Sequence, residues 1–329
     1  MMITSSEYRK RLSKMRRNVY MDGEVIDRDD SRLEGGTNRI AKTYDMVTDP
    51  EFKGYEDILT ATSHLTGKKI NRFCHTHRNV ADLLAKQKMT RVTCHQVGGC
   101  IDRCMGIDAI NANSVAAHEA DQAHGTAYYE RFESWLRDFQ ENDRSACCAQ
   151  TDVKGNRPAR PHEQLDPDLY LHVVETKSDG IVIRGAKVHN SVAPVVEWLM
   201  VIPTRRLTKE EGEWAVSCAV PADAEGVKLI VSAARSPISK ELGMPGPYVG
   251  ADSLTIFDNV FVPWENVFLN GEYEIGGRLA LLFALYHRHS YTGCKPAFTD
   301  VIMGATALMA ECNGIEKKPH VGEKLAELI

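Results

Sequence analysis

Apolar side chains recur at helical intervals through the first part of the chain. Between residues 106 and 140 the apolar and aromatic positions follow three- and four-residue intervals, as on the buried face of a helix. Thr4 and Glu7 have the spacing of a capping box, which indicates that a helix begins ahead of the basic residues that follow. The pattern predicts an N-terminal helical domain over residues 1–145.

From residue 146 onward the pattern changes to short apolar runs, rich in Val and Ile and separated by turn residues. Two such runs flank Ser178-Asp179-Gly180, which is typical of a β-hairpin with an Asp-Gly turn. We therefore expect a central antiparallel β domain over residues 146–276. Its further strands are expected in the segments 196–203, 214–220, 227–234 and 254–263.

Helical periodicity returns after Gly276-Gly277, in the segments 278–291 and 296–312. Asn313-Gly314 is a helix-stop signal, and a further helical pattern begins near the end of the chain without an end signal. We expect an α+β protein whose last part, residues 277–329, is the incomplete beginning of a C-terminal helical domain. On this expectation the 329 residues alone could be an inactive fragment.

Charge and hydropathy exclude several classes of protein. The chain has 40 Lys and Arg against 45 Asp and Glu, and its net charge of -5 provides no general field for attracting nucleic acid. The most apolar stretch, 279–286, is too short to span a bilayer, so a membrane protein is not expected. We do not expect a secretion signal, because no apolar region follows the basic residues between positions 9 and 17. These observations favour a cytoplasmic protein.

The chain has nine cysteines, an odd number, and it is too large to depend on disulfides for its stability. Reduced thiols or metal ligands are therefore expected. Cys100 and Cys104 are four residues apart where helical periodicity begins, so both sulfurs should lie on one face and within reach of one metal centre. Two small buried residues would show the same spacing, and this pair alone is weak evidence.

His287 and Cys294 flank a Ser-Tyr-Thr-Gly segment. We expect this segment to leave helical geometry and to turn both side chains toward one point. Three thiols and one imidazole suit either a structural zinc or an iron–sulfur cluster with one unusual ligand, and spacing does not choose between them. The other cysteines are expected to be buried hydrophobic residues, with a weak ligand alternative for His75, His77 and His95.

Six segments occur in an order and spacing that resemble the 4-hydroxybutyryl-CoA dehydratases, a branch of the 4-hydroxyphenylacetate 3-hydroxylase flavoprotein family. The resemblance runs from the N-terminus to Ile329 and implies the acyl-CoA dehydrogenase-like architecture: a helical domain, a β domain and a C-terminal helical bundle. The segments are NRFCHTH, GGCIDRCMGIDAINA, QTDVKGNR, IRGAKVHNS, FDNVFVP and YHRHSYTGCK.

The resemblance implies two cofactors, FAD and a [4Fe-4S] cluster held by three cysteines and one histidine. Without it, the proposed flavin segments would be interpreted as ordinary turns of the β domain. The positions that match the cluster ligands are Cys100, Cys104, His287 and Cys294. The positions that match flavin-contacting residues are Gln150, Thr151, Asp152, Gly155 and Arg157 in one segment, and His189, Asn190 and Ser191 in another.

Four residues match catalytic positions of the family. His287 is expected to be both a metal ligand and a base. Tyr291 is expected to transfer a proton or donate a hydrogen bond, and Lys295 to provide electrostatic stabilisation. A core tyrosine and a solvated lysine are the alternatives for the last two. Asp252 stands where the family has a glutamate, and its side chain is one methylene shorter.

The resemblance implies dehydration of 4-hydroxybutyryl-CoA to crotonyl-CoA through a flavin-generated substrate radical, with an associated vinylacetyl-CoA isomerase activity. An acyl-CoA substrate and a homotetrameric full-length form are implied with it. The alternative within the family is a flavin-dependent aromatic 3-monooxygenase, in which the cysteines would be packing residues. A non-catalytic protein with a structural zinc at the same four ligands is a third hypothesis.

Overall fold

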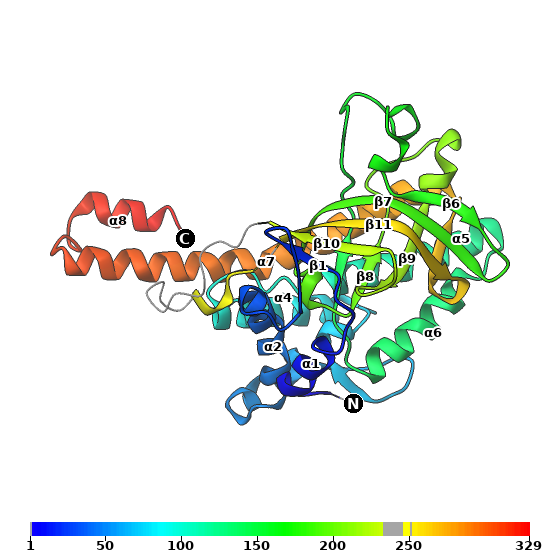
Figure 1. Ribbon diagram of the computed structural model, residues 1–329. Helices are drawn as coiled ribbons and strands as arrows, with labels where there is room; N and C mark the ends of the chain where they lie inside the picture. The colour runs from blue at the N-terminus through cyan, green and yellow to red at the C-terminus, as the bar shows by residue number, and fades with distance from the viewer. Residues whose placement is uncertain (1, 233–245, 251) are drawn as a thin grey trace.

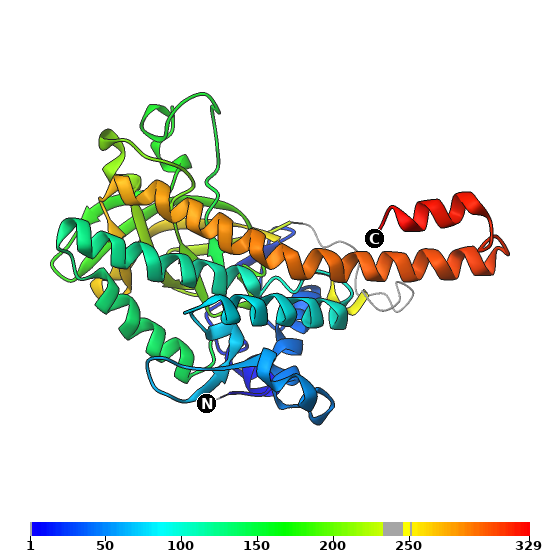
Figure 2. The same ribbon diagram turned by 180° about the vertical axis from the view of Figure 1, so that it is seen from behind.

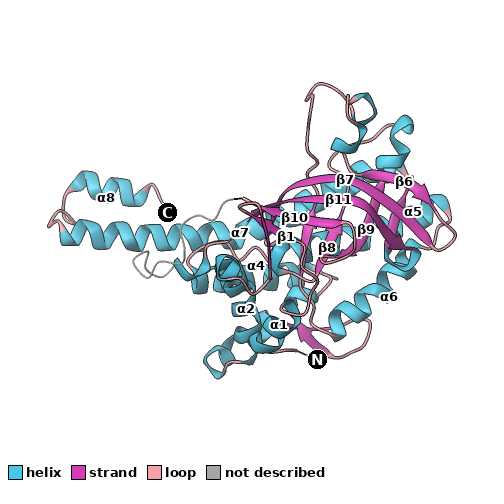
Figure 3. Ribbon diagram, in the orientation of Figure 1, coloured by secondary structure: helices cyan, strands magenta, loops and turns pink. Residues whose placement is uncertain are grey.

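Two β-sheets and a layer of long helices form the body of the molecule (Figures 1 and 3). The computed structural model describes residues 2–232, 246–250 and 252–329. In chain order its longer helices are α1 (Ser5–Leu12), α2 (Glu34–Thr48), α4 (Val80–Val97), α5 (Cys104–His124), α6 (Tyr128–Glu141), α7 (Tyr273–Cys312) and α8 (Pro319–Ala326), and a short α3 spans Glu56–Leu59. Thr4 caps α1 through the expected capping box with Glu7, as its sequence predicts.

The larger sheet has six strands in the order β2-β1-β10-β11-β7-β6. These strands are β1 (Val19–Met21), β2 (Glu24–Ile26), β6 (His172–Thr176), β7 (Gly180–Ser191), β10 (Val227–Val231) and β11 (Asp252–Pro263). The β6–β7 hairpin confirms the Asp-Gly turn, since the amide of Lys177 donates to the carbonyl of Gly180 at 2.8 Å. Part of the strand expected over 227–234 lies outside the described residues.

The smaller sheet has four strands in the order β12-β9-β8-β5. Its strands are β5 (Ala146–Ala149), β8 (Trp198–Val201), β9 (Val216–Pro221) and β12 (Val267–Asn270), and a separate pair is formed by β3 (Thr60–Thr62) and β4 (Lys69–Asn71). The pairings are mostly antiparallel, but β5 pairs with β8 and β1 with β10 in parallel. Because β1 and β2 come from the N-terminal region, that region is not wholly helical as expected.

The hydrophobic core has two parts, one between the helices and the smaller sheet and one between the two sheets. In the first part Phe132 and Trp135 of α6 pack on Phe268 of β12, with ring centroids 5.4 and 5.8 Å apart. Burying each such ring contributes about 1.5–3 kcal/mol, so this cluster holds α6 firmly against the sheet.

Helix α7 is continuous over 40 residues, so the expected break between residues 291 and 296 is wrong. Gly293 faces α4 rather than a turn: a Cβ there would lie 2.4 Å from the backbone oxygen of Gln87 and 3.1 Å from the amide of Arg91. Pro296 has no N–H to donate to the carbonyl of Thr292. The side-chain amide of Gln87 on α4 donates to that carbonyl instead, at 3.4 Å. Close packing on α4 therefore explains both residues.

Figure 2 shows α7 running past α5 and α4 and then projecting from the body, with α8 folded back beside it. The helix ends at Cys312, just before the expected stop at Asn313-Gly314, where Gly314 has a φ of 65°. The part of α7 from Gly276 to Ala297 packs against α4 and α5, and this part contains both His287 and Cys294.

Substituting Gly293 tests the α4–α7 contact. Gly293→Ala should lower the free energy of unfolding by roughly 1–3 kcal/mol, because its methyl group meets backbone atoms of α4. Gly304→Ala, on the same helix with nothing within 4 Å of its Cβ, should raise that free energy by roughly 0.5–1 kcal/mol. Urea denaturation measures both, and equal stabilisation by the two substitutions would contradict the packing described.

Candidate functional site

The three expected cysteine ligands lie where α4, α5 and α7 meet. Gly98 ends α4 with a φ of 63° and Asp102 has a φ of 58°, so the chain turns sharply before α5 begins at Cys104. Cys100 therefore precedes the helix instead of sharing its face, contrary to the spacing argument. Its sulfur nevertheless lies in hydrogen-bonding contact with the thiols of Cys104 and Cys294.

His287 joins these thiols from α7. His287 and Cys294 are two helical turns apart, which places both side chains on one face of α7 without any break in the helix. Ligand atoms of Cys104, His287 and Asp108 lie within 4.8 Å of one another. Cys104 therefore lies beside His287, and Cys100 lies beside both Cys104 and Cys294, so the four residues come to one junction from three segments of the chain.

Hydrogen bonds make the three thiols unequal. Hydrogen bonding with Cys104, and then with Cys294, lowers the pKa of Cys100 well below its ordinary value. The same hydrogen bonds, together with burial, raise the pKa of Cys104 and of Cys294. Three neighbouring sulfurs are a donor set suited to a thiophilic metal centre, because thiolates bind metal in place of their protons.

Asp108 is a member of the site that sequence reasoning missed. Its carboxylate is fully buried on α5, one turn after Cys104, and its Oδ2 lies 3.0 Å from Nδ1 of His287. Lys86 of α4 forms an ion pair with Oδ1, and Ser290 of α7 donates to both carboxylate oxygens at 3.2 and 3.0 Å. An acidic residue four positions after a candidate ligand, and so one helical turn along the same helix, was the available signal.

The imidazole of His287 is enclosed by aromatic rings. Phe283 stacks on it with centroids 5.4 Å apart and an interplanar angle of 8°, and Tyr291 meets it edge-on at 4.9 Å. Burial, followed by the nearby thiols, raises the pKa of Tyr291, so its hydroxyl stays protonated at neutral pH. The ammonium of Lys295 lies 5.1 Å from the Tyr291 ring. Tyr291 therefore lies against His287, and Lys295 lies against Tyr291.

The two expected flavin segments also meet. The amide of Val188 donates to the carbonyl of Thr151 at 2.8 Å, and the carbonyl of Gln150 accepts from Lys187 at 2.8 Å. Asp152 is buried and forms an ion pair with Lys187 at 2.7 Å, so its carboxylate already has a partner within the β domain. Asn190 is buried as well, and its side-chain oxygen has no hydrogen-bond partner among the described residues.

The remaining flavin candidates and Asp252 lie at the surface. A Cβ on Gly155 would lie 2.4 Å from the Leu169 side chain, so packing alone accounts for that glycine. Arg157 is exposed, as is His189. Ser191 donates a hydrogen bond to Asp252, which is exposed and pairs with it across β7 and β11. No contact recorded for the described residues joins Asp252 to His287.

The other cysteines and histidines largely follow the expectation of ordinary packing. His75 lies 3.3 Å from Asp82 and His95 lies 2.8 Å from Asp300, both through Nε2. His77 is different, because neither ring nitrogen has a partner among the described residues. Cys312 is exposed on the projecting part of α7, so its expected burial is wrong. The cysteines that are buried as expected are Cys74, Cys94, Cys147, Cys148 and Cys218.

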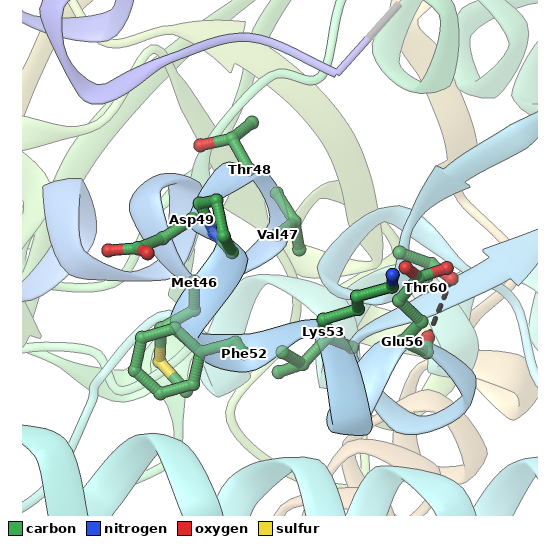
Figure 4. Close-up of a pocket in the computed structure, with 10 residues that line it drawn as sticks. Met46, Val47, Thr48, Asp49, Phe52, Lys53, Glu56 and Thr60 are labelled. Atoms are coloured by element: carbon green, nitrogen blue, oxygen red, sulfur yellow. Dashed lines mark hydrogen bonds between the residues drawn. The ribbon is translucent and has the colours of Figure 1, made fainter.

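A separate pocket of about 340 Å³ lies where α2 ends and α3 begins (Figure 4). Its lining includes Met46, Phe52 and Leu59, with Lys53 and Glu56 at the same pocket. None of the residues singled out by the sequence lines it. The thiol and imidazole cluster, not this pocket, therefore carries the chemistry that the sequence predicts.

Family comparisons cover almost the whole chain. A family model described as 4-hydroxyphenylacetate 3-hydroxylase N terminal matches residues 4–269, and one described as 4-hydroxyphenylacetate 3-hydroxylase C terminal matches residues 277–329. The chain is 40% identical over 337 aligned residues to the 4-hydroxybutyryl-CoA dehydratase/vinylacetyl-CoA-Delta-isomerase of Clostridium aminobutyricum. That alignment covers 100% of this chain and 68% of the relative.

Solved structures agree with these matches. An oxygen-tolerant archaeal 4-hydroxybutyryl-CoA dehydratase from N. maritimus superposes with a TM-score of 0.92 at 34% identity, covering 100% of this chain and 66% of that one. The oxygenase component of 4-hydroxyphenylacetate 3-monooxygenase, complexed with FAD, superposes with a TM-score of 0.84 at 25% identity, covering 99% of this chain and 68% of that one. The chain thus spans about two thirds of the length of these relatives.

The expected acyl-CoA dehydrogenase-like α+β fold is confirmed. Butyryl-CoA dehydrogenase from Megasphaera elsdenii superposes with a TM-score of 0.52 at 13% identity, covering 92% of this chain and 68% of that one. This likeness concerns the fold alone. Within the described residues, no helix combines the length and the apolar character needed to cross a membrane.

The unpartnered imidazole of His77 should make stability depend on pH. Burial, and then the charge of Lys86, lowers the pKa of His77 to about 2. An imidazole in the unfolded chain takes up its proton near pH 6.5, so stability should fall as the pH decreases below about 6.5, by up to about 1.4 kcal/mol per pH unit. His77→Gln should reduce the difference between unfolding free energies measured at pH 7.5 and at pH 5.5. An unchanged difference would contradict the assignment.

Proposed function

The chain belongs to the 4-hydroxyphenylacetate 3-hydroxylase family, and from that premise we propose that it is an FAD- and [4Fe-4S]-dependent enzyme that dehydrates 4-hydroxybutyryl-CoA to crotonyl-CoA. The observation that carries the proposal is the meeting of Cys100, Cys104, His287 and Cys294 at one junction of helices. The relatives named dehydratases match the chain at higher identity than the monooxygenase does.

The donor set favours an iron–sulfur cluster over packing. Cysteines that only fill a core have no need to gather, whereas here the sulfur of Cys100 lies beside those of Cys104 and Cys294. Cys100 also reaches the surface, which ordinary core packing does not require. Three cysteines and one histidine would hold the cluster, with His287 at the corner that differs from the others.

The two linked β-domain segments would hold FAD. Asn190 offers a buried oxygen without a partner among the described residues, and Gln150 and Thr151 lie on the segment that hydrogen-bonds to β7. Arg157, His189 and Ser191 complete the proposed contacts, while Asp152 and Gly155 maintain the conformation of the segment that carries Gln150 and Thr151. Of these, Asp152 would act by fixing Lys187 and the loop instead of touching the flavin, because its carboxylate is already paired.

The reaction needs more than an ordinary base, because the hydrogen on C3 lies one carbon beyond the position that a thioester acidifies. When bound, FAD supplies one-electron transfer and the cluster supplies a Lewis-acidic iron. The protein supplies positioned proton donors and acceptors. The protonated hydroxyl of Tyr291 donates toward the leaving group, and Lys295 stabilises negative charge beside it.

His287 and Asp252 are the proposed proton acceptors. His287 lies against Tyr291, and once it is displaced from the metal it would accept a proton through Nε2, the ring nitrogen that does not face Asp108. The Asp252 carboxylate accepts from Ser191 at the edge of the proposed flavin site. Vinylacetyl-CoA isomerisation uses the same proton movements without loss of water, and we include this activity in the proposal.

We also propose that the full-length form is a cytoplasmic homotetramer acting on an acyl-CoA. The assembly is supported by apolar side chains that α7 exposes to solvent, because exposed apolar faces of this kind are typical of subunit interfaces. They are Leu281, Leu285, Phe298, Ile302, Leu308 and Met309.

Anaerobic purification tests the proposed function. The full-length form should be brown, contain about four iron and four sulfide per chain together with FAD, and convert 4-hydroxybutyryl-CoA to crotonyl-CoA. Light scattering on the same sample should give the mass of four subunits. A yellow protein that lacks iron and hydroxylates a phenol would establish the monooxygenase alternative, and one zinc without flavin would establish a structural metal site.

A single cysteine substitution separates ligands from packing residues. Cys294→Ala should remove most of the iron after anaerobic reconstitution, because only two cysteine ligands remain. Cys218→Ala is the matched control, since Cys218 is also buried but lies in β9. Iron and sulfide analysis, with thermal unfolding as a check on folding, measures both. Equal iron contents in the two variants would contradict the ligand assignment.

A further inference from the structure

The carboxylate of Asp108 is the most enclosed negative charge at the proposed metal centre. Asp108 and Lys86 both have side chains that are 0% exposed, and they form an ion pair. Lys86 also donates to the backbone carbonyl of Tyr286 at 2.9 Å. The pair therefore connects α4, α5 and α7 at the level of His287.

Asp108 lies close enough to Cys104 and His287 to be a third metal ligand, but its oxygens already have partners. Oδ1 accepts from Lys86 and from Ser290, and Oδ2 accepts from Ser290 and faces Nδ1 of His287 at 3.0 Å. A carboxylate that binds a metal must give up such donors and leave the buried ammonium without a counter-charge. Asp108 is therefore better suited to support a ligand than to be one.

The same contacts determine which ring nitrogen of His287 is available. A carboxylate is an acceptor, so the short contact requires a proton on Nδ1. The ring cannot easily turn over, because Phe283 stacks on one side and Tyr291 meets its edge. In the neutral ring a proton on Nδ1 leaves Nε2 as the nitrogen with a lone pair that can bind a metal.

We propose that Asp108, held in place by Lys86 and Ser290, is a positioning residue that fixes the imidazole of His287 with its proton on Nδ1 and presents Nε2 to the metal centre. This inference rests on the proposed function, since it assigns His287 to a metal. Histidine ligands commonly donate their second ring N–H to a carboxylate, which fixes the ring and makes it a stronger donor. Here the ion pair with Lys86 keeps that carboxylate charged inside the protein.

Removing both members of the ion pair is the sharpest test, because Asp108→Asn alone would leave the Lys86 ammonium buried without a counter-charge. The double variant Lys86→Met and Asp108→Leu keeps the side-chain volumes similar and removes both charges. Glu211→Gln is the matched control: Glu211 is also fully buried, and it accepts from Arg160 and lies 3.1 Å from Nδ1 of His162. It belongs to the 3₁₀ segment Lys209–Trp214 instead of the α4–α5–α7 junction.

The first readout uses the metal-free chain labelled with ¹⁵N-histidine, in which NMR identifies the tautomer of His287. The Nδ1–H tautomer is expected in the unsubstituted chain and in Glu211→Gln, and a mixture of tautomers in the double variant. The second readout uses the reconstituted chain, in which loss of iron to a chelator should be roughly 10–100-fold faster in the double variant. Thermal unfolding shows whether each variant is folded.

The outcomes separate the inference from the proposed function. An unchanged tautomer and an unchanged rate of iron loss in a folded double variant would overturn the positioning role while leaving the iron–sulfur centre intact. The Nε2–H tautomer in the unsubstituted chain would overturn it as well. If the unsubstituted chain shows the Nδ1–H tautomer but takes up no cluster, the proposed function fails, and with it the assignment of Nε2 to a metal.

Discussion

Close packing of α7 on α4 and α5 is the constraint on which the rest of the structure depends. Gly293 allows the backbones of α4 and α7 to approach each other. The buried ion pair between Lys86 and Asp108 then connects these two helices to α5. This position of α7 places His287 beside Cys104, the first residue of α5, and Cys294 beside Cys100, which precedes α5. The candidate metal site is therefore a consequence of helix packing and not of a local sequence motif.

The sequence was sufficient for features that depend on neighbouring residues. The capping box at Thr4, the Asp-Gly hairpin and the stop at Asn313 all involve contacts within a few positions, and all three are present. The continuity of α7 was missed because Gly293 and Pro296 resemble helix breakers until α4 is seen beside them. Strands β1 and β2 were missed because each has three residues, and β1 pairs with residues 229 and 230.

The candidate site was predictable to the same degree. Cysteine and histidine identities and the family resemblance were enough to name four ligands, but neither could show that Asp108 lies against His287, 179 positions away. In the β domain the resemblance named Asp152 and Gly155 as flavin residues, whereas the structure gives each a structural role, in an ion pair with Lys187 and in packing on Leu169. Contacts between residues that are far apart in the sequence decide such roles, and a single sequence does not show those contacts.

The central claim is that three thiols and one imidazole hold one iron–sulfur cluster beside a flavin. The most direct test is an anomalous diffraction map at the iron absorption edge from a crystal of the protein grown without oxygen. The account predicts one compact iron–sulfur cube, bonded to the sulfurs of Cys100, Cys104 and Cys294 and to Nε2 of His287. A map without iron at this junction, or with iron bonded to other side chains, would contradict it.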